Sequence, residues 1–188
     1  MFKRLALALL CALSLAAGGV ERFPVEQRLD LSRLGFVDAK GKKCVVGDFK
    51  GRVVVVDFWA VWCGPCRRSL PELNALQQQG REKGTLVVIP CNLDEDLWPR
   101  SVVRFLDRNA EALPGFLSYR AQLGKAGIGS NLGHDIASFP TTLVIDGKGR
   151  LAARWSGYTE GLLVAELNRA LAELAEEAAA QATEAPAP

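Results

Sequence analysis

The most informative segment of this 188-residue chain reads Val53-Val54-Val55-Val56-Asp57-Phe58-Trp59-Ala60-Val61-Trp62-Cys63-Gly64-Pro65-Cys66. Its first half is rich in β-branched and aromatic residues and lacks polar alternation, which predicts a central strand covered on both faces. Its second half ends in two cysteines separated by two residues. We predict a helix from Cys63 to about Gln79, with Gly80 as its stop. The cysteine pair therefore lies where a buried strand passes into a helix.

A pair of cysteines with this spacing has three interpretations. Half of a zinc site needs a second pair or several histidines, and the chain has one histidine, His134, and no second pair of this spacing. A purely structural disulfide in so small a ring restricts the unfolded chain little. Redox catalysis fits the context best, because a helix N-terminus stabilises a thiolate, the form that attacks disulfides. We expect Cys63 to be exposed and nucleophilic, and Cys66, one turn further on, to be less exposed and to resolve the mixed disulfide.

The rest of the chain alternates between strand and helix patterns. A turn at residues 38–42 has short strands predicted on either side. Further strands are predicted at residues 85–90, 141–145 and 150–155, and further helices at about 98–109 and about 159–178. The order, β-α-β-α-β-β-α with an N-terminal β addition, predicts an α/β fold with a mixed sheet and helices on its faces.

Four segments resemble one known family. Residues Asp57 to Cys66 resemble the thioredoxin active site almost residue for residue. The segments Phe49 to Gly51, Arg67 to Leu73 and Phe139 to Gly147 are similar to the exported TlpA/ResA-like thiol–disulfide oxidoreductases of the thioredoxin superfamily. The resemblance covers about residues 30–175. It implies a thioredoxin fold, a central mixed β-sheet flanked by helices, here with an N-terminal β-strand or hairpin extension, and redox exchange on protein disulfides without a cofactor.

The resemblance assigns further residues to the site. Asp57 lies where thioredoxins keep a buried carboxylate, and burial there is expected to raise its pKa and let it accept the proton of Cys66. Pro140 lies where the family places a cis-proline facing the cysteines, although most X-Pro bonds are trans. The residue before it presents its backbone to an extended substrate strand. The substrate-binding residues expected by resemblance are Trp62, Gly64, Pro65, Phe139 and Pro140.

The N-terminus has the pattern of a secretory signal peptide. A basic start, Met1 to Arg4, precedes an apolar run from Leu5 to Ala17, and small residues follow. We predict a signal peptide at residues 1–19, a thioredoxin-like domain at 20–178 and a disordered tail at 179–188. A periplasmic or otherwise exported protein follows from this division. The alternative is that the first segment stays uncleaved as a membrane anchor.

Composition limits the classes of partner. Cleavage removes Lys3 and Arg4, so 23 basic residues become 21, equal to the 21 acidic ones. Because the mature chain is then near neutral and carries no basic patch, nucleic acid is not expected as a partner. The partners that remain are cysteine-containing exported clients, such as apocytochromes during cytochrome c biogenesis, and a membrane protein that donates electrons. No metal and no small-molecule cofactor is expected.

The remaining polar and sulfur-bearing residues leave alternatives open. Cys44 and Cys91 lie in strands that could be neighbours, which would allow a structural disulfide, or they are two separate buried thiols. His134 follows a glycine in an irregular segment and reads as an ordinary loop residue. It could instead join Cys63 and Cys66 as a Cu(I) ligand, which makes a copper-binding chaperone or metal-site assembly factor the alternative function.

Overall fold

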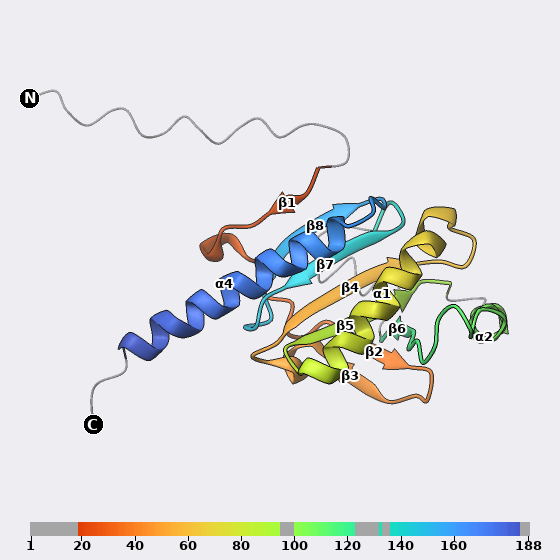
Figure 1. The fold of residues 1–188 in the computed structure, drawn as a ribbon, viewed down its shortest axis with the longest axis horizontal. Coiled ribbons are helices and arrows are strands. Elements are labelled where there is room, and N and C mark those ends of the chain that lie inside the picture. Colours follow the sequence, from red (N-terminus) through yellow and green to blue (C-terminus); the bar gives the residue numbers. More distant parts are fainter. Residues whose placement is uncertain (1–18, 95–99, 123–131, 133–135, 185–188) are drawn as a thin grey trace, which may run out of the picture.

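The computed structural model describes residues 19–94, 100–122, 132 and 136–184 (Figure 1). The signal peptide predicted for residues 1–19 lies outside the described residues except for Gly19, and so do His134 and residues 185–188. Among the described helices, none is both long and apolar enough to cross a membrane.

A single sheet organises the described residues. Its strand order is β1-β8-β7-β4-β5-β6-β2-β3, with β4 pairing in parallel with β5 and antiparallel with β7. The strands are β1 (Glu21–Arg22), β2 (Gly35–Asp38), β3 (Lys43–Val45), β4 (Val53–Trp59), β5 (Leu86–Asn92), β6 (Tyr119–Ala121), β7 (Thr141–Ile145) and β8 (Leu151–Ser156). The helices are α1 (Gly64–Lys83), α2 (Arg100–Arg108) and α4 (Leu162–Glu184), with short 3-10 turns η1 (Val25–Gln27) and η2 (Val46–Phe49). The predicted mixed sheet with flanking helices and an N-terminal β addition is confirmed.

The central strand β4 explains the two layers of the core. Every residue of β4 is buried, and its side chains alternate between two apolar clusters. Val53, Val55 and Trp59 pack with residues of α1 and α4, whereas Val54, Val56 and Phe58 pack in a cluster on the opposite face. Figure 1 shows α1 and α4 lying across the same side of the sheet. By this alternation Asp57 belongs to the side that α1 and α4 cover.

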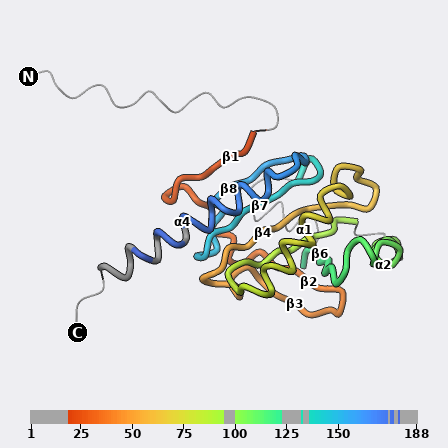
Figure 2. The backbone as a smooth tube through the Cα atoms, viewed as in Figure 1, coloured from red at the N-terminus to blue at the C-terminus, as the bar shows by residue number. Residues whose placement is uncertain are grey.

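The N-terminal segment is held against α4 by ion pairs. The guanidinium of Arg28 is almost fully buried and contacts Asp146 at 3.0 Å and Glu173 at 2.6 Å. Arg22 forms a second pair with Glu166 of α4. The tube in Figure 2 shows the segment around β1 running beside β8 on the way to the opposite edge of the sheet, where β2 and β3 lie.

Two helix ends differ from the predictions. α1 does not stop at Gly80 but continues to Lys83, and Gly84 ends it in a left-handed conformation with φ of 72°. Gly80 is needed for a different reason, because a Cβ there would lie 2.6 Å from the carbonyl oxygen of Leu86 in β5. α4 continues to Glu184, so residues 179–184, predicted as part of a disordered tail, are helical.

The proposed neighbourhood of Cys44 and Cys91 is wrong. Cys44 lies on β3, the last strand of the sheet, and Cys91 lies on β5. Both β6 and β2 lie between these strands, and neighbouring strands are about 5 Å apart. A disulfide requires Cα atoms closer than about 7 Å. Among the described residues the structure records one disulfide, and it does not join Cys44 to Cys91.

Candidate active site

The cysteine pair opens helix α1 directly after the turn that follows β4. Cys63 is the N-cap residue, with φ of −80° and ψ of 107°, and the helix begins at Gly64. Pro65 fits the first turn because a backbone N–H group there would have no hydrogen-bond acceptor within the helix. Cys63 and Cys66 are joined by a disulfide, and the Cys63 Sγ accepts a hydrogen bond from the Cys66 backbone N–H at 3.1 Å. The chain is therefore described in its oxidised form.

The predicted exposure of Cys63 is wrong for this oxidised form. Its relative exposure is 4%, against 0% for Cys66. Trp62 is 66% exposed, and its ring meets that of Phe139 edge to face, with the centroids 5.5 Å apart. The sequence could not show this contact because it joins residues from two distant segments. The predicted order of the two cysteines holds, with Cys63 the more exposed residue.

The loop before β7 reaches the cysteine turn from the other side. The peptide bond between Phe139 and Pro140 is cis, as the family resemblance implied. The loop is fixed by two hydrogen bonds, from Thr141 Oγ1 to the Ser138 carbonyl at 2.8 Å and from the Gly157 N–H to the Pro140 carbonyl at 2.8 Å. The contact of Phe139 with Trp62 places this loop beside the disulfide-bearing turn.

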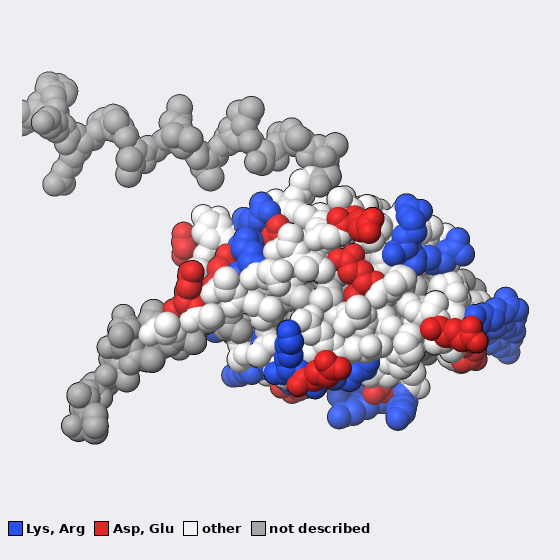
Figure 3. Space-filling model, viewed as in Figure 1, with Lys and Arg blue, Asp and Glu red and all other residues white. Residues whose placement is uncertain are grey.

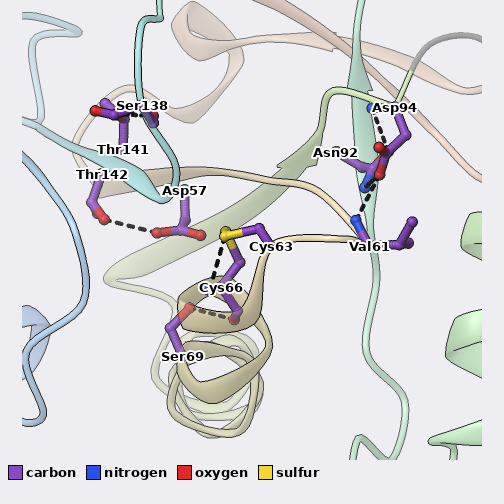
Figure 4. Close-up of a disulfide and its surroundings, with 10 residues drawn as sticks. All are labelled: Asp57, Val61, Cys63, Cys66, Ser69, Asn92, Asp94, Ser138, Thr141 and Thr142. Carbon is purple, nitrogen blue, oxygen red and sulfur yellow. Dashed lines mark hydrogen bonds between the residues drawn. A yellow bond between two sulfur atoms is a disulfide. The ribbon is translucent and has the colours of Figure 1, made fainter.

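Asp57 is the buried carboxyl group beneath the disulfide. It is 2% exposed, and its Oδ2 accepts a hydrogen bond from Thr142 Oγ1 of the neighbouring strand at 2.7 Å. Burial raises the pKa of Asp57 to about 7, the hydrogen bond from Thr142 opposes this, and the negative charge of Glu72 adds to it. In Figure 4 the carboxyl group of Asp57 points toward the sulfur atoms. A carboxyl group with this pKa can both accept and release a proton near neutral pH.

A second buried carboxylate, Asp94, holds the turn that carries the cysteines. Its Oδ2 accepts from the Val61 N–H at 2.7 Å and from Asn92 Nδ2 at 3.0 Å. The Asp94 N–H in turn donates to Asn92 Oδ1 at 2.9 Å (Figure 4). Sequence reasoning missed both residues. The signal was present, since Asn92 and Asp94, separated only by Leu93, lie at the end of an apolar strand that pairs with β4, and such strand ends gather at one edge.

Removal of the Asp94 carboxylate should loosen this turn. We expect Asp94→Ala to lower the free energy of unfolding by about 2 kcal/mol, because the Val61 N–H loses a charged acceptor. Disulfide-exchange activity should fall as well, since Cys63 follows Val61 by two residues. Urea unfolding of the oxidised protein measures the first effect. Asp107→Ala, which removes an exposed carboxylate from α2, is the control, and equal stabilities of the two variants would contradict the role of Asp94.

Charge around the site is mixed. Arg67 and Arg68 are exposed on the first turns of α1. Figure 3 shows basic and acidic side chains interspersed over the face that carries α1 and α4. The described residues bring together no group of three or more histidine, cysteine, aspartate or glutamate side chains suited to a metal ion. His134, the remaining ligand of the copper alternative, lies outside them.

Comparison with known proteins identifies the fold and the family. The Redoxin family model matches residues 24–171. Thioredoxin-like protein YneN of Bacillus subtilis is 32% identical over 58% of this chain and 59% of its own length. Thiol-disulfide oxidoreductase ResA of Bacillus thuringiensis subsp. konkukian is 27% identical over 72% of this chain and 75% of its own length.

Solved structures agree with the fold. A secreted thiol-disulfide isomerase from Corynebacterium glutamicum superposes with a TM-score of 0.68 at 21% identity, covering 87% of this chain and 96% of its own. A DsbF homologue from Corynebacterium diphtheriae gives a TM-score of 0.65 at 20% identity, covering 84% and 97%. The thioredoxin-like fold expected from the sequence is confirmed.

Proposed function

This chain belongs to the Redoxin family and carries the Cys63–Cys66 centre of a ResA-like thiol–disulfide oxidoreductase, and from that premise we propose that it reduces disulfides in exported client proteins. The observation that supports this most is the combination at one helix N-terminus. A cysteine pair that forms a disulfide lies above a buried carboxyl group whose pKa is about 7. That combination supplies both a nucleophile and a proton acceptor.

The exchange begins with the reduced pair. The Cys63 thiolate attacks one sulfur of the client disulfide, the client S–S bond breaks, and the other client sulfur leaves as a thiolate that takes a proton from solvent. Cys66 then gives its proton to Asp57 and attacks the Cys63 sulfur. The mixed disulfide breaks, the second client thiolate leaves, and the Cys63–Cys66 disulfide remains. The client gains two electrons, and an external donor, which we propose to be a membrane protein, returns two electrons and two protons to the pair.

Substrate binding is proposed at the surface around the disulfide. Trp62 is exposed and Phe139 flanks it, so the two rings offer an apolar contact beside the sulfurs. Gly64 has no side chain to obstruct an approaching chain, and Pro65 is exposed next to it. The backbone before the cis-proline Pro140 would pair with an extended client segment. Cysteine-bearing segments of exported proteins, apocytochromes c among them, fit these requirements.

Export is part of the proposal. The pattern of residues 1–19 supports it, and so does the similarity to a relative described as secreted. Mass spectrometry of the mature N-terminus after expression in a Gram-negative host tests it. A chain beginning near residues 17–20 in the periplasmic fraction is expected, and a full-length chain in the cytoplasm would contradict export.

The reducing direction is tested by the reduction potential of the Cys63/Cys66 couple against glutathione. The Gly64-Pro65 pair between the cysteines is the one of thioredoxin, and we expect a value near that of thioredoxin, about −270 mV. A value near −120 mV, typical of a strong oxidant, would overturn the reductant assignment. Tight Cu(I) binding without acceleration of insulin reduction by dithiothreitol would favour the metallochaperone alternative.

A further inference from the structure

Helices α1 and α4 enclose a seam on the face of the sheet where Asp57 lies. The seam is lined by apolar residues of both helices and of β8: Cys66, Leu70, Trp155, Leu163 and Leu167, all at most 6% exposed. Asp57 enters it from β4 between Val55 and Trp59, the two neighbours that face the same cluster. A proton accepted by Asp57 therefore has no direct contact with solvent.

A second carboxyl group, Glu72, lies at the outer end of this seam. It projects from α1 toward the start of α4, where it accepts hydrogen bonds from the backbone N–H groups of Gly161 and Val164 and from the phenol of Tyr158. Unlike Asp57 it is only partly buried. Glu72 therefore connects the interior of the seam with the molecular surface.

Each of the two carboxyl groups has one oxygen without a protein partner. Asp57 Oδ1 and Glu72 Oε1 are both buried, and neither has a hydrogen-bond partner among the described residues. The two groups also interact electrostatically, since the charge of Glu72 raises the pKa of Asp57. A role in capping α4 alone does not need this arrangement, because a glutamine would accept the same hydrogen bonds without placing a like charge beside Asp57.

The other charged groups around Glu72 are few. Burial has the largest effect on the pKa of Glu72 and raises it, and the negative charge of Glu160, in the loop before α4, raises it further. The hydrogen bonds from Val164, Tyr158 and Gly161 lower it. The positive charge of Arg68 on α1 lowers the pKa of Tyr158. The pKa of both carboxyl groups is therefore raised, so each can hold a proton closer to neutral pH than an exposed carboxyl group can.

We propose that Glu72 is the proton outlet of Asp57 in the exchange reaction, a role that rests on the function proposed above. When Cys66 attacks the mixed disulfide, its proton passes to the Asp57 carboxylate. The neutral Asp57 gives that proton to the Glu72 carboxylate, and Glu72 releases it to solvent at the surface edge of the seam. Asp57 is thereby ionised again for the next turnover, and the client thiolate takes its own proton from solvent.

The test compares Glu72→Gln with Glu82→Gln, which removes an exposed carboxylate from the same helix. The titration of Asp57 is followed by carbon NMR of its carboxyl group in the oxidised protein. In Glu72→Gln its midpoint should move down toward the ordinary aspartate range, because a like charge has been removed, and Glu82→Gln should leave it in place. Tyr158→Phe keeps both carboxyl groups, so the midpoint of the Asp57 titration should stay close to that of the wild-type protein.

The rate of client-thiol release over repeated turnovers, with dithiothreitol as electron donor, gives the kinetic test. At pH 6 and low buffer concentration, this rate should be about tenfold slower in Glu72→Gln, because Asp57 is ionised again only between turnovers. Added imidazole should restore the rate, because a mobile base can replace the outlet. Glu72→Asp, which keeps a carboxyl group, should recover much of the rate. Attack by Cys63 should not change in any of these variants.

Two results would overturn the proposal. The first is an Asp57 midpoint and a release rate that both match wild type in Glu72→Gln. The second is a slower release that imidazole does not restore and that follows the loss in Tm, which would leave Glu72 as a cap of α4 only. Failure of the wild-type protein to reduce any disulfide would contradict the proposed function instead. The NMR titration needs no client, so it would still show whether the charge of Glu72 raises the pKa of Asp57.

Discussion

Cys63→Ser is expected to reduce the acceleration of insulin disulfide reduction by dithiothreitol to the rate of dithiothreitol alone. A serine hydroxyl does not ionise at neutral pH and cannot replace the thiolate that attacks the client. Cys66→Ser should lose turnover just as completely but by a different route. Its Cys63 can still attack, and the mixed disulfide then accumulates because no second thiol resolves it. The covalent adduct is detected as an added client mass in non-reducing mass spectrometry.

The matched control is Cys44→Ser. Cys44 lies at the far edge of the sheet on β3, and burial raises the pKa of its thiol, so it should take no part in exchange. This variant should keep the wild-type rate and form no stable adduct. Residual activity in Cys63→Ser, or an adduct attached to Cys44 or Cys91 in Cys66→Ser, would show that the Cys63–Cys66 pair is not the working centre.

Asp57→Asn should make the oxidised protein more stable at neutral pH and slower in exchange. The pKa of Asp57 is about 7 in the folded chain, against 3.8 for an ordinary aspartate. Below about pH 3 both states hold the proton and the residue has no differential effect. As pH rises toward 7 the unfolded chain loses the proton first, so ionisation favours unfolding. The penalty then stays constant above pH 7, at most about 4 kcal/mol, since one pKa unit corresponds to about 1.4 kcal/mol.

Asparagine cannot ionise, so the variant should escape this penalty while its side-chain oxygen still accepts from Thr142. Urea unfolding at several pH values should give equal stabilities near pH 3 and a growing advantage for Asp57→Asn up to pH 7. Resolution of the mixed disulfide at pH 7 should be slower by about tenfold to a hundredfold, because the proposed proton acceptor is gone. Asp107→Asn, at an exposed position on α2, is the control. A pH profile of stability parallel to wild type would exclude the raised pKa.

The long helices and strands could be predicted from the sequence because their hydrophobic patterns extend over many residues. β4, α1 and α4 each have a continuous apolar or helical signal, and the structure places them where the patterns predicted. β6 has only the residues Tyr119 to Ala121 and no period to detect, so it exists because β5 and β2 offer it hydrogen bonds on both sides. The same absence of local signal hid β1, which pairs with β8.

The site divides in the same way. The motif around Cys63 and Cys66 and the carboxyl of Asp57 are local in sequence and could be predicted. Asp94 and Glu72 act through contacts with segments remote in the chain, which only the folded arrangement reveals. The suggested pairing of Cys44 with Cys91 was wrong for a related reason, since it depended on strand order, and the insertion of β6 next to β5 was not foreseen.

Both outer edges of the sheet are formed by very short strands from the N-terminal segment. β1 has two residues and β3 has three. A long open edge is a template on which other extended chains add strands and aggregate. A protein that binds clients in extended conformations, as we propose for this chain, would meet this hazard at every encounter. Within the described residues, neither outer strand is long enough to recruit a client segment over more than a few residues. This leaves the loop of Phe139 and Pro140, the proposed binding surface, as the place where a client backbone is expected to pair.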